Sequence, residues 1–273
     1  DPDGDWSSDV CSSDLWDKKN VVSNRIHIKE SKVMASTLAQ YKSNRIDVFC
    51  DYNLLQNGDI EDENKYTKQL IGDGISLNFN LNKDNFMKDI KFRKGIKYAI
   101  DKEEIKKELG EVFKETCSYL PNSSLNATNR SYNIKSAEEL LKDSKYNGEV
   151  VKIVYANNED NNKKVINSIE KNLKKAKVNV DIQGYSKEEL KNIIYKGNYD
   201  IALLNYSGDS TMPLTYLEKW VSNSKQNLFG YKNINFDNCI LKGKVCVNKL
   251  EAQKKFNEGE KILLEDIGTV PIG

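Results

Sequence analysis

At 273 residues the chain is long enough for one large domain or two smaller ones, each with its own hydrophobic core. Its 42 lysines and arginines almost balance 41 acidic residues, which argues against the basic face of a nucleic-acid-binding protein and against a polybasic membrane surface. The single histidine, His27, limits metal and acid–base chemistry, and no apolar run in the sequence is long enough to span a bilayer.

The five cysteines form no Cys-x-x-Cys pair, so zinc-ribbon and thioredoxin-like sites have little support. Cys239 and Cys246 stand seven residues apart and are able to form a disulfide if the protein is exported, although spacing alone does not bring two Cβ atoms together. His27 has neither a second histidine nor clustered acids beside it. We therefore expect it to be structural or exposed, with no metal site and no Ser/His/Asp triad.

Residues 5–15 (DWSSDVCSSDL) match, residue for residue, the translation of a common sequencing-library adapter. We expect residues 1–15 to be an artefactual segment of this origin, the alternative being a flexible terminus rich in Ser and Asp. The native sequence then starts at Trp16, and any export signal lies upstream of it.

Short alternating stretches follow this segment. Residues 25–29 are predicted to form a strand, a helix begins at Ser31, and residues 46–50 form another strand. Residues 51–75 are polar and loop-like, and residues 76–81 alternate again as a strand.

Two helices come next. An apolar stripe over residues 92–100 predicts a packed helix. Asp101 begins the second helix, with Glu104 three residues later as in a capping box, and Gly110 ends it. Residues 117–133, rich in Ser, Asn and Tyr, are expected to form a long loop.

Strand and helix patterns alternate regularly after Ser136 and Glu139, which repeat the helix-start signal. We predict strands over 150–155, 178–182 and 199–206, and helices over 165–173 and from Ser186 to Gly197. This β-α-β-α-β order is typical of a parallel α/β unit. Further helices are expected near Pro213 and over 249–264.

Several short motifs occur in an order that resembles one bacterial family. They are Trp16–Val21 (WDKKNV), Phe79–Asn82 (FNLN), Ile90–Ile105 (IKFRKGIKYAIDKEEI), Gly197–Ala202 (GNYDIA), Phe236-Asp237 and Glu260–Ile272. Each is weak alone, but together they span residues 16–273. The chain therefore resembles the bacterial extracellular solute-binding proteins of family 5, which include oligopeptide, dipeptide and nickel receptors of ABC importers.

The resemblance implies an α/β, periplasmic-binding-protein-like fold of type II, in which two lobes close over a ligand. Residues 16–80 would be the C-terminal part of an incomplete first lobe, and residues 81–268 the second lobe. Residues 269–273 would begin a truncated return to the first lobe, so that the chain is an internal fragment.

By the same resemblance, the protein would bind peptides outside the membrane, with oligopeptides favoured, and deliver them to the permease of an ABC transporter. It would be no enzyme and would need no cofactor, metal or nucleic acid. We expect a monomer that is a cell-surface lipoprotein or periplasmic, touching the membrane only through an anchor outside this fragment. The alternatives are the same fold binding nickel complexes, haem or oligosaccharides, a sensor of peptide signals, and a hydrolase, which one histidine makes improbable.

The candidate ligand site follows the strand 199–206, because ligands gather beyond the carboxyl ends of strands in open α/β sheets. By resemblance, Asp209 would pair with the α-ammonium group of a bound peptide, and Tyr206 would be the aromatic lining the pocket. The backbone of Ser207 and Gly208 would pair with the peptide main chain.

Asp209 has a simpler interpretation as the cap of a helix near Pro213. The resemblance favours the ligand contact. Leu203 occupies the position where some family members carry an arginine for a short peptide's carboxylate, which favours longer peptides.

Overall fold

The computed structural model describes residues 7–11, 19–20, 25–30, 33–50, 73–110, 113–121, 123, 132–209 and 212–273. These residues divide into two compact units, Asp1–Ile60 and Glu61–Gly273. The predicted lobe boundary after residue 80 differs from this division, and the assignment of residues to lobes stays a prediction. Of the predicted loops, residues 51–72, 122 and 124–131 lie outside the described residues, and residues 74 and 75 belong to a strand instead of a loop.

The first unit contains two strands and a helix. Strand β1 (Ser7–Cys11) pairs antiparallel with β2 (Arg25–Lys29), Asp9 lying opposite His27, and α1 spans Met34–Lys42. The strand over 25–29 is thus confirmed, whereas the strand predicted over 46–50 is wrong, since these residues are irregular. The adapter origin of residues 1–15 stays a prediction.

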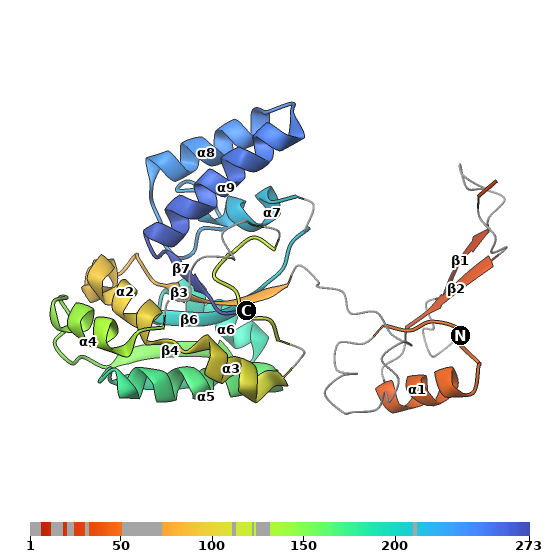
Figure 1. The fold of residues 1–273 in the computed structure, drawn as a ribbon, viewed down its shortest axis with the longest axis horizontal. Helices are drawn as coiled ribbons and strands as arrows, with labels where there is room; N and C mark the ends of the chain where they lie inside the picture. Colours follow the sequence, from red (N-terminus) through yellow and green to blue (C-terminus); the bar gives the residue numbers. More distant parts are fainter. Residues whose placement is uncertain are drawn as a thin grey trace. The chain divides into compact units, whose positions relative to one another are not determined.

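The second unit is built on one mixed sheet with the strand order β5-β4-β6-β3-β7 (Figure 1). Its strands are β3 (Gly74–Phe79), β4 (Val151–Ala156), β5 (Val180–Tyr185), β6 (Ile201–Tyr206) and β7 (Thr269–Pro271). The strands β5, β4 and β6 are parallel to one another, which confirms the predicted α/β unit, while β3 runs antiparallel to β6 and β7.

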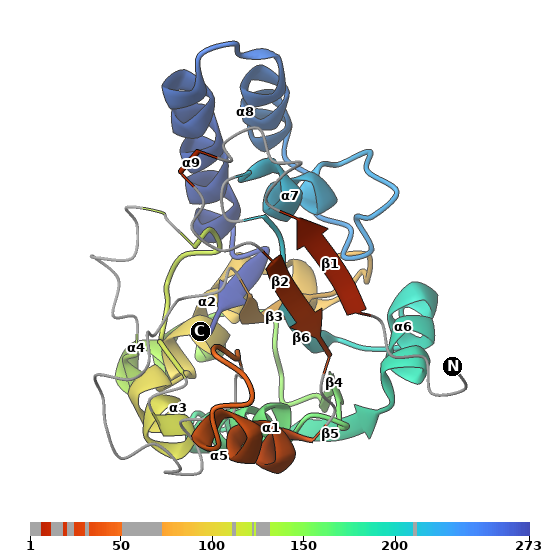
Figure 2. The same ribbon diagram turned by 90° about the vertical axis from the view of Figure 1, so that its right-hand side faces the viewer.

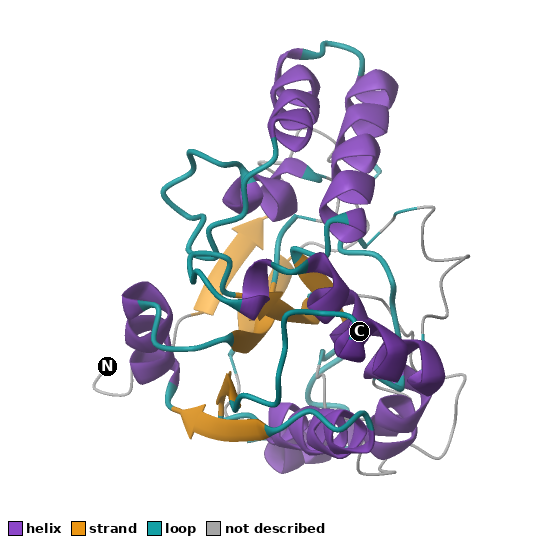
Figure 3. Ribbon diagram, turned by 90° about the vertical axis from the view of Figure 1, so that its left-hand side faces the viewer, coloured by secondary structure: helices purple, strands orange, loops and turns teal. Residues whose placement is uncertain are grey.

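Helices cover both faces of this sheet (Figure 3). The helices on one face are α2 (Ile90–Ala99), α3 (Lys102–Leu109), α4 (Ile134–Lys142) and α5 (Asp160–Lys175). Those on the other face are α6 (Lys187–Lys196), α7 (Leu214–Leu217), α8 (Ile234–Val245) and α9 (Lys249–Glu265). The described part of the unit also has two short 3-10 helices, Phe86–Lys88 and Glu218–Trp220.

The alternation of side chains along β6 divides the core into two clusters. Ile201 and Leu203 pack with the cluster under α2 and α5, whereas Ala202 and Tyr206 pack with the cluster under α6 to α9. Both faces of β6 are therefore buried, which explains its nearly continuous apolar sequence.

Local capping chemistry defines several helix ends. Ser186 and Glu189 form the predicted capping box, and Gly197 ends α6 in the left-handed region at φ 71°. The helix predicted to start at Ser136 instead begins after Asn133, whose side chain accepts the N–H of Ser136. The predicted signal at Ser136 was wrong because Asn133, three residues earlier, offers an equally good cap.

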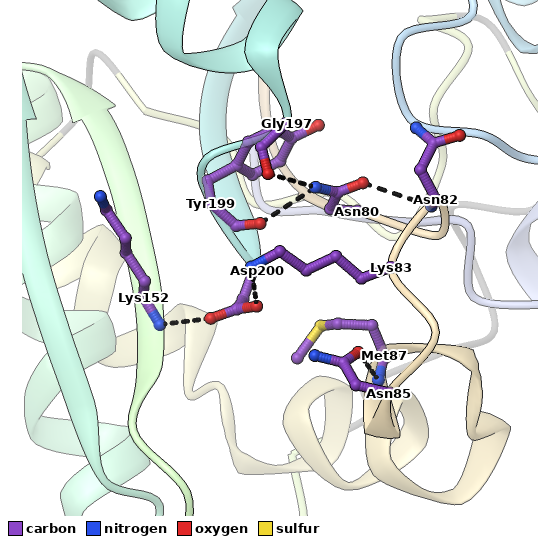
Figure 4. Close-up of polar contacts among 9 residues, drawn as sticks. All are labelled: Asn80, Asn82, Lys83, Asn85, Met87, Lys152, Gly197, Tyr199 and Asp200. Atoms are coloured by element: carbon purple, nitrogen blue, oxygen red, sulfur yellow. Dashed lines mark hydrogen bonds and ion pairs between the residues drawn. The ribbon is translucent and has the colours of Figure 1, made fainter.

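Two of the sequence motifs meet at the start of β6 (Figure 4). The amide of Asn80 donates to the carbonyls of Gly197 and Tyr199 at 3.1 and 3.0 Å. The carboxylate of Asp200 accepts the ammonium group of Lys83 at 2.7 Å and the backbone N–H of Lys152 at 2.8 Å. Since Asn80 and Asp200 are both buried, the FNLN and GNYD motifs hold β3, β4 and β6 together.

Arg93, in the third motif, is also structural. The residue is 7% exposed, and its guanidinium group donates to the carbonyls of Met87, Asp266 and Ile267 at 2.7, 2.8 and 3.1 Å. It thereby joins the beginning of α2 to the turn before β7. Among the described residues, no helix is both long and apolar enough to cross a membrane.

Candidate functional site

The candidate site lies where β6 ends and β3 begins. The antiparallel register places Gly74 opposite Tyr206, so that Asp73 and Ser207 are the next opposing residues. One end of the sheet therefore carries Asp73, Ser207, Gly208 and Asp209. Asn80 and Asp200 form their hydrogen bond at the opposite end.

Tyr206 belongs mainly to the core. Its side chain is 8% exposed, and its ring stacks on that of Tyr119 with 4.2 Å between centroids. A Cβ atom at Gly74 would lie 2.3 Å from the Tyr206 ring, so the glycine makes room for the ring on the neighbouring strand. Burial raises the pKa of Tyr206 well above its ordinary value, which keeps the hydroxyl neutral.

Hydrogen bonds join the main chain of Gly208 and Asp209 to residues 212–216. The carbonyl of Gly208 accepts the hydroxyl of Tyr216 at 2.8 Å. The N–H of Asp209 donates to Oγ1 of Thr215 at 3.0 Å, and its carbonyl accepts the N–H of Met212 at 2.8 Å. These bonds fix the path of the loop, with Ser207, Gly208 and Asp209 exposed.

Asp209 does not cap α7. This helix begins after Pro213, and no side chain makes a capping hydrogen bond there. The simpler interpretation of Asp209 as a helix cap is therefore not what the structure shows, and its carboxylate stays a candidate for ligand binding.

The charge of a second carboxylate, that of Asp73, affects the same hydroxyl group as the charge of Asp209 does. Burial raises the pKa of Tyr216, and the charges of Asp73 and Asp209 raise it further. Both acids therefore lie close enough to the Tyr216 hydroxyl to affect its titration. Asp73 lies in the stretch 51–75 that the sequence predicts only as a polar loop, because its proximity to Asp209 depends on the pairing of β3 with β6.

Lys219 is another neighbour that sequence alone did not indicate. Its ammonium group lies 5.4 Å from the ring centroids of both Tyr119 and Tyr206. Burial lowers the pKa of Lys219 to about 8. A cation is thus held against the aromatic pair beneath the loop that carries Asp209.

A cavity of about 610 Å³ opens on the other side of the end of β6. Its wall is mostly apolar, and its polar members are Glu159, Asn162, Lys187, Lys191, Asn192 and Asn205. The carboxylate of Glu159 accepts the ammonium group of Lys187 at 2.6 Å and also the amide of Asn205. The lining residues are Ala156, Glu159, Asn162, Lys187, Leu190, Lys191, Asn192, Ile194, Tyr195, Leu203, Leu204, Asn205, Leu228 and Phe229.

Leu203 has no exposed surface and packs into the core cluster under α5.

Among the described residues, no group of three His, Cys, Asp or Glu side chains is placed to hold a metal ion. The structure therefore offers acids, aromatic rings and an apolar hollow at this end of the sheet, which suit an organic ligand that carries a positive charge.

Comparisons with known proteins identify the family and the fold of the chain. The model of the bacterial extracellular solute-binding proteins, family 5 (middle region), matches residues 12–227. The probable D,D-dipeptide-binding periplasmic protein DdpA of Escherichia coli K12 is 22% identical over 121 residues, which are 43% of this chain and 23% of that protein.

Two solved structures share the fold. The unliganded periplasmic murein tripeptide binding protein MppA is 20% identical with a TM-score of 0.80, covering 94% of this chain and 53% of MppA. A putative peptide binding protein AppA from Clostridium difficile is 18% identical with a TM-score of 0.75, covering 92% of this chain and 54% of AppA. The chain thus spans about half the length of these structures. It has the α/β fold of periplasmic peptide-binding proteins, and by its family match it belongs to the bacterial extracellular solute-binding proteins of family 5.

Proposed function

We propose that this chain is part of the substrate-binding component of an ABC importer and that its ligand is a peptide. The observation that carries the proposal is the pair of carboxylates, Asp73 and Asp209, at the end of β6. A carboxylate forms a strong charge-assisted hydrogen bond with an ammonium group, and two of them would hold the amino terminus of a peptide.

The neighbouring cavity supports the same ligand class. Its apolar wall suits a peptide side chain, and polar members such as Glu159, Lys187 and Asn205 suit main-chain groups. The names of DdpA, MppA and AppA describe proteins that bind dipeptides, a murein tripeptide and peptides. Because Leu203 supplies no charge for a short peptide's carboxylate, oligopeptides are the favoured ligands.

The remaining parts of the proposal follow from the family. The protein would act outside the cytoplasm, anchored by a lipid or free in a periplasm, and would pass its ligand to the permease without chemical change. Closing of two lobes over the peptide would exclude water from the Asp209–ammonium pair and so strengthen it.

Calorimetric titration of the full-length protein tests the proposal. We expect peptides of three to six residues to bind, and N-acetylation of the same peptides to weaken binding at least about tenfold, since acetylation removes the charge that the acids hold. Asp209→Asn and Asp73→Asn are each expected to weaken the free-amine peptide but not its acetylated form.

Asp84→Asn is the matched control, because the Asp84 side chain is 95% exposed and lies at the opposite end of β3. It should leave peptide affinity unchanged. Equal affinity for free and acetylated peptides in the wild type would show that the acids do not bind an amino terminus. Binding of a nickel complex or an oligosaccharide without any peptide binding would assign another ligand class.

A further inference from the structure

The helices α8 and α9 form an antiparallel hairpin that projects from the rest of the second unit (Figure 2). They pack closely through Phe236, Ile240 and Gly243 on α8 and Phe256 on α9. A Cβ atom at Gly243 would lie 2.6 Å from the Phe256 ring, so the glycine allows the two helices to approach. The hairpin therefore already has a complete internal packing face.

The far end of the hairpin, residues 241–250, carries a second set of apolar side chains. We call these residues the hairpin tip. Four aliphatic side chains in it are exposed: Leu241 by 60%, Val245 by 72%, Val247 by 99% and Leu250 by 75%. Such a group on a short surface element indicates a contact with something apolar outside the unit.

Lysines flank this apolar stripe in a regular way. At about 100° per residue, Leu241 and Val245 share one face of α8, and Lys242 and Lys244 lie about 80° to either side of its centre. Lys249 stands next to Leu250 at the start of α9. Lysine stems cover apolar surface while the ammonium groups reach outwards, a pattern typical of segments that lie at a lipid–water interface.

The local charge differs from that of the whole chain. The hairpin tip, residues 241–250, contains three lysines and no acidic residue, whereas the chain as a whole has a net charge of +1. Lys244 is paired with Glu218 at 2.6 Å, while Lys242, Lys249 and Lys254 form no ion pair among the described residues. The tip is thus a basic, aliphatic surface in a chain whose even balance had argued against contact with a membrane.

We propose that the hairpin tip docks on an anionic lipid surface, with its aliphatic side chains entering the interface and its lysines facing the lipid phosphates. The composition favours lipid over protein, because protein interfaces are enriched in aromatic residues and Arg and depleted in Lys. Each lysine near such a surface contributes about fivefold in affinity. This contact is separate from ligand binding, since the tip supplies no residue to the candidate site or to the cavity.

Vesicle sedimentation of the full chain tests the proposal. We expect binding to vesicles of phosphatidylglycerol and phosphatidylcholine in equal amounts, much weaker binding to phosphatidylcholine alone, and release by high salt. Val247→Asp should lower binding at least about fivefold, and Lys242→Gln with Lys249→Gln should lower it more than about tenfold. These side chains are exposed, so the variants should fold.

Matched controls are Val150→Asp, at a residue 62% exposed before β4, and the pair Lys106→Gln and Lys107→Gln on the exposed face of α3. They should bind vesicles as the wild type does, and the tip variants should keep wild-type peptide affinity. Equal sedimentation with both kinds of vesicle overturns the proposal, as does undiminished binding by the tip variants. A concentration-dependent dimer lost in Val247→Asp, without vesicle binding, would show instead that the tip contacts a second copy of the chain.

Discussion

The carboxylate of Glu260 accepts the backbone N–H of Tyr119 at 2.7 Å, and through this contact α9 fixes the ring that covers Tyr206. The same oxygen accepts the hydroxyl of Ser118 at 2.6 Å and the N–H of Leu120 at 2.8 Å. Glu260 has no exposed surface. A buried carboxylate of this kind is stabilised by the donors around it, and it orders the segment 118–120 beside the candidate site.

Glu260→Gln is therefore expected to lower the free energy of unfolding by about 2 kcal/mol, because hydrogen bonds to a charged acceptor become bonds to a neutral one. The measurement is urea unfolding followed by tyrosine and tryptophan fluorescence. Glu258→Gln on the same helix is the control, since Glu258 is 53% exposed and forms a surface ion pair with Lys255. Equal unfolding midpoints for the two variants would contradict the structural role of Glu260.

Arg93 gives a second prediction on stability. Lysine in its place keeps the charge but cannot donate to three separate carbonyls with a planar group. We expect Arg93→Lys to lower the free energy of unfolding by about 2–4 kcal/mol, since at least one buried carbonyl loses its donor. Lys91→Gln, on the exposed side of α2, should change little. If Arg93→Lys unfolds with the wild-type midpoint, the guanidinium contacts are not needed for stability.

The parts of the fold that were predictable depend on neighbours in sequence. The Ser186–Glu189 box and Gly197 specify α6 within twelve residues, and the alternation of strands and helices specifies the parallel unit. The helix α8 was missed because apolar residues occur on two of its faces, such as Ile240 inside and Leu241 outside, which hides the helical period.

The candidate site was only partly predictable, because it depends on contacts far apart in sequence. Asp209 was selected from its position after β6, but the proximity of Asp73 follows from an antiparallel pairing that no local pattern encodes. Tyr119 comes from a segment expected to be a loop, and its stacking on Tyr206 depends on Glu260 of α9. Non-local contacts of this kind leave no periodic signal in the sequence.

The thiols of Cys239 and Cys246 provide a chemical prediction. Neither forms a disulfide, and the thiol of Cys246 donates a hydrogen bond to the carboxylate of Glu251 at 3.6 Å. Seven residues along a helix separate the two cysteines by about 10 Å, which exceeds the reach of a disulfide. Burial raises the pKa of Cys239, and the charge of Glu258 raises it further. Because the thiolate is the reactive form, we expect slow alkylation of Cys239 by iodoacetamide near neutral pH.

Mass spectrometry of peptides after timed alkylation without reductant measures the rate for Cys239. Glu258→Gln should speed the labelling of Cys239, because it removes a charge that raises the pKa of this thiol. Glu251→Gln is the control on the same helix as Glu258. It should not change the rate, since Glu251 is not among the charges that shift the pKa of Cys239. A peptide pair joined by a disulfide between the two cysteines would contradict the geometry of α8.

Lys219 gives the prediction on pH. Its ordinary pKa of 10.5 applies in the unfolded chain, and burial lowers it to about 8 in the folded protein. Below pH 8 the lysine is charged in both states, and the full cost of burying the charge is present. Between about pH 8 and 10.5 only the unfolded chain keeps the proton, so this group makes the folded state more stable as pH rises.

Lys219→Met removes this dependence. We expect the variant to be more stable than the wild type at pH 7, because the charge is no longer buried, and the difference to shrink by pH 9.5. Urea unfolding of wild type and variant at each pH measures this difference in stability. Burial also lowers the pKa values of Lys97 and Lys102, but their titration is common to both proteins and cancels in the difference. A difference that stays constant from pH 7 to 9.5 would show that Lys219 titrates alike in both states. A wild type more stable than the variant at pH 7 would show that the rings of Tyr119 and Tyr206 stabilise the cation by more than burial costs.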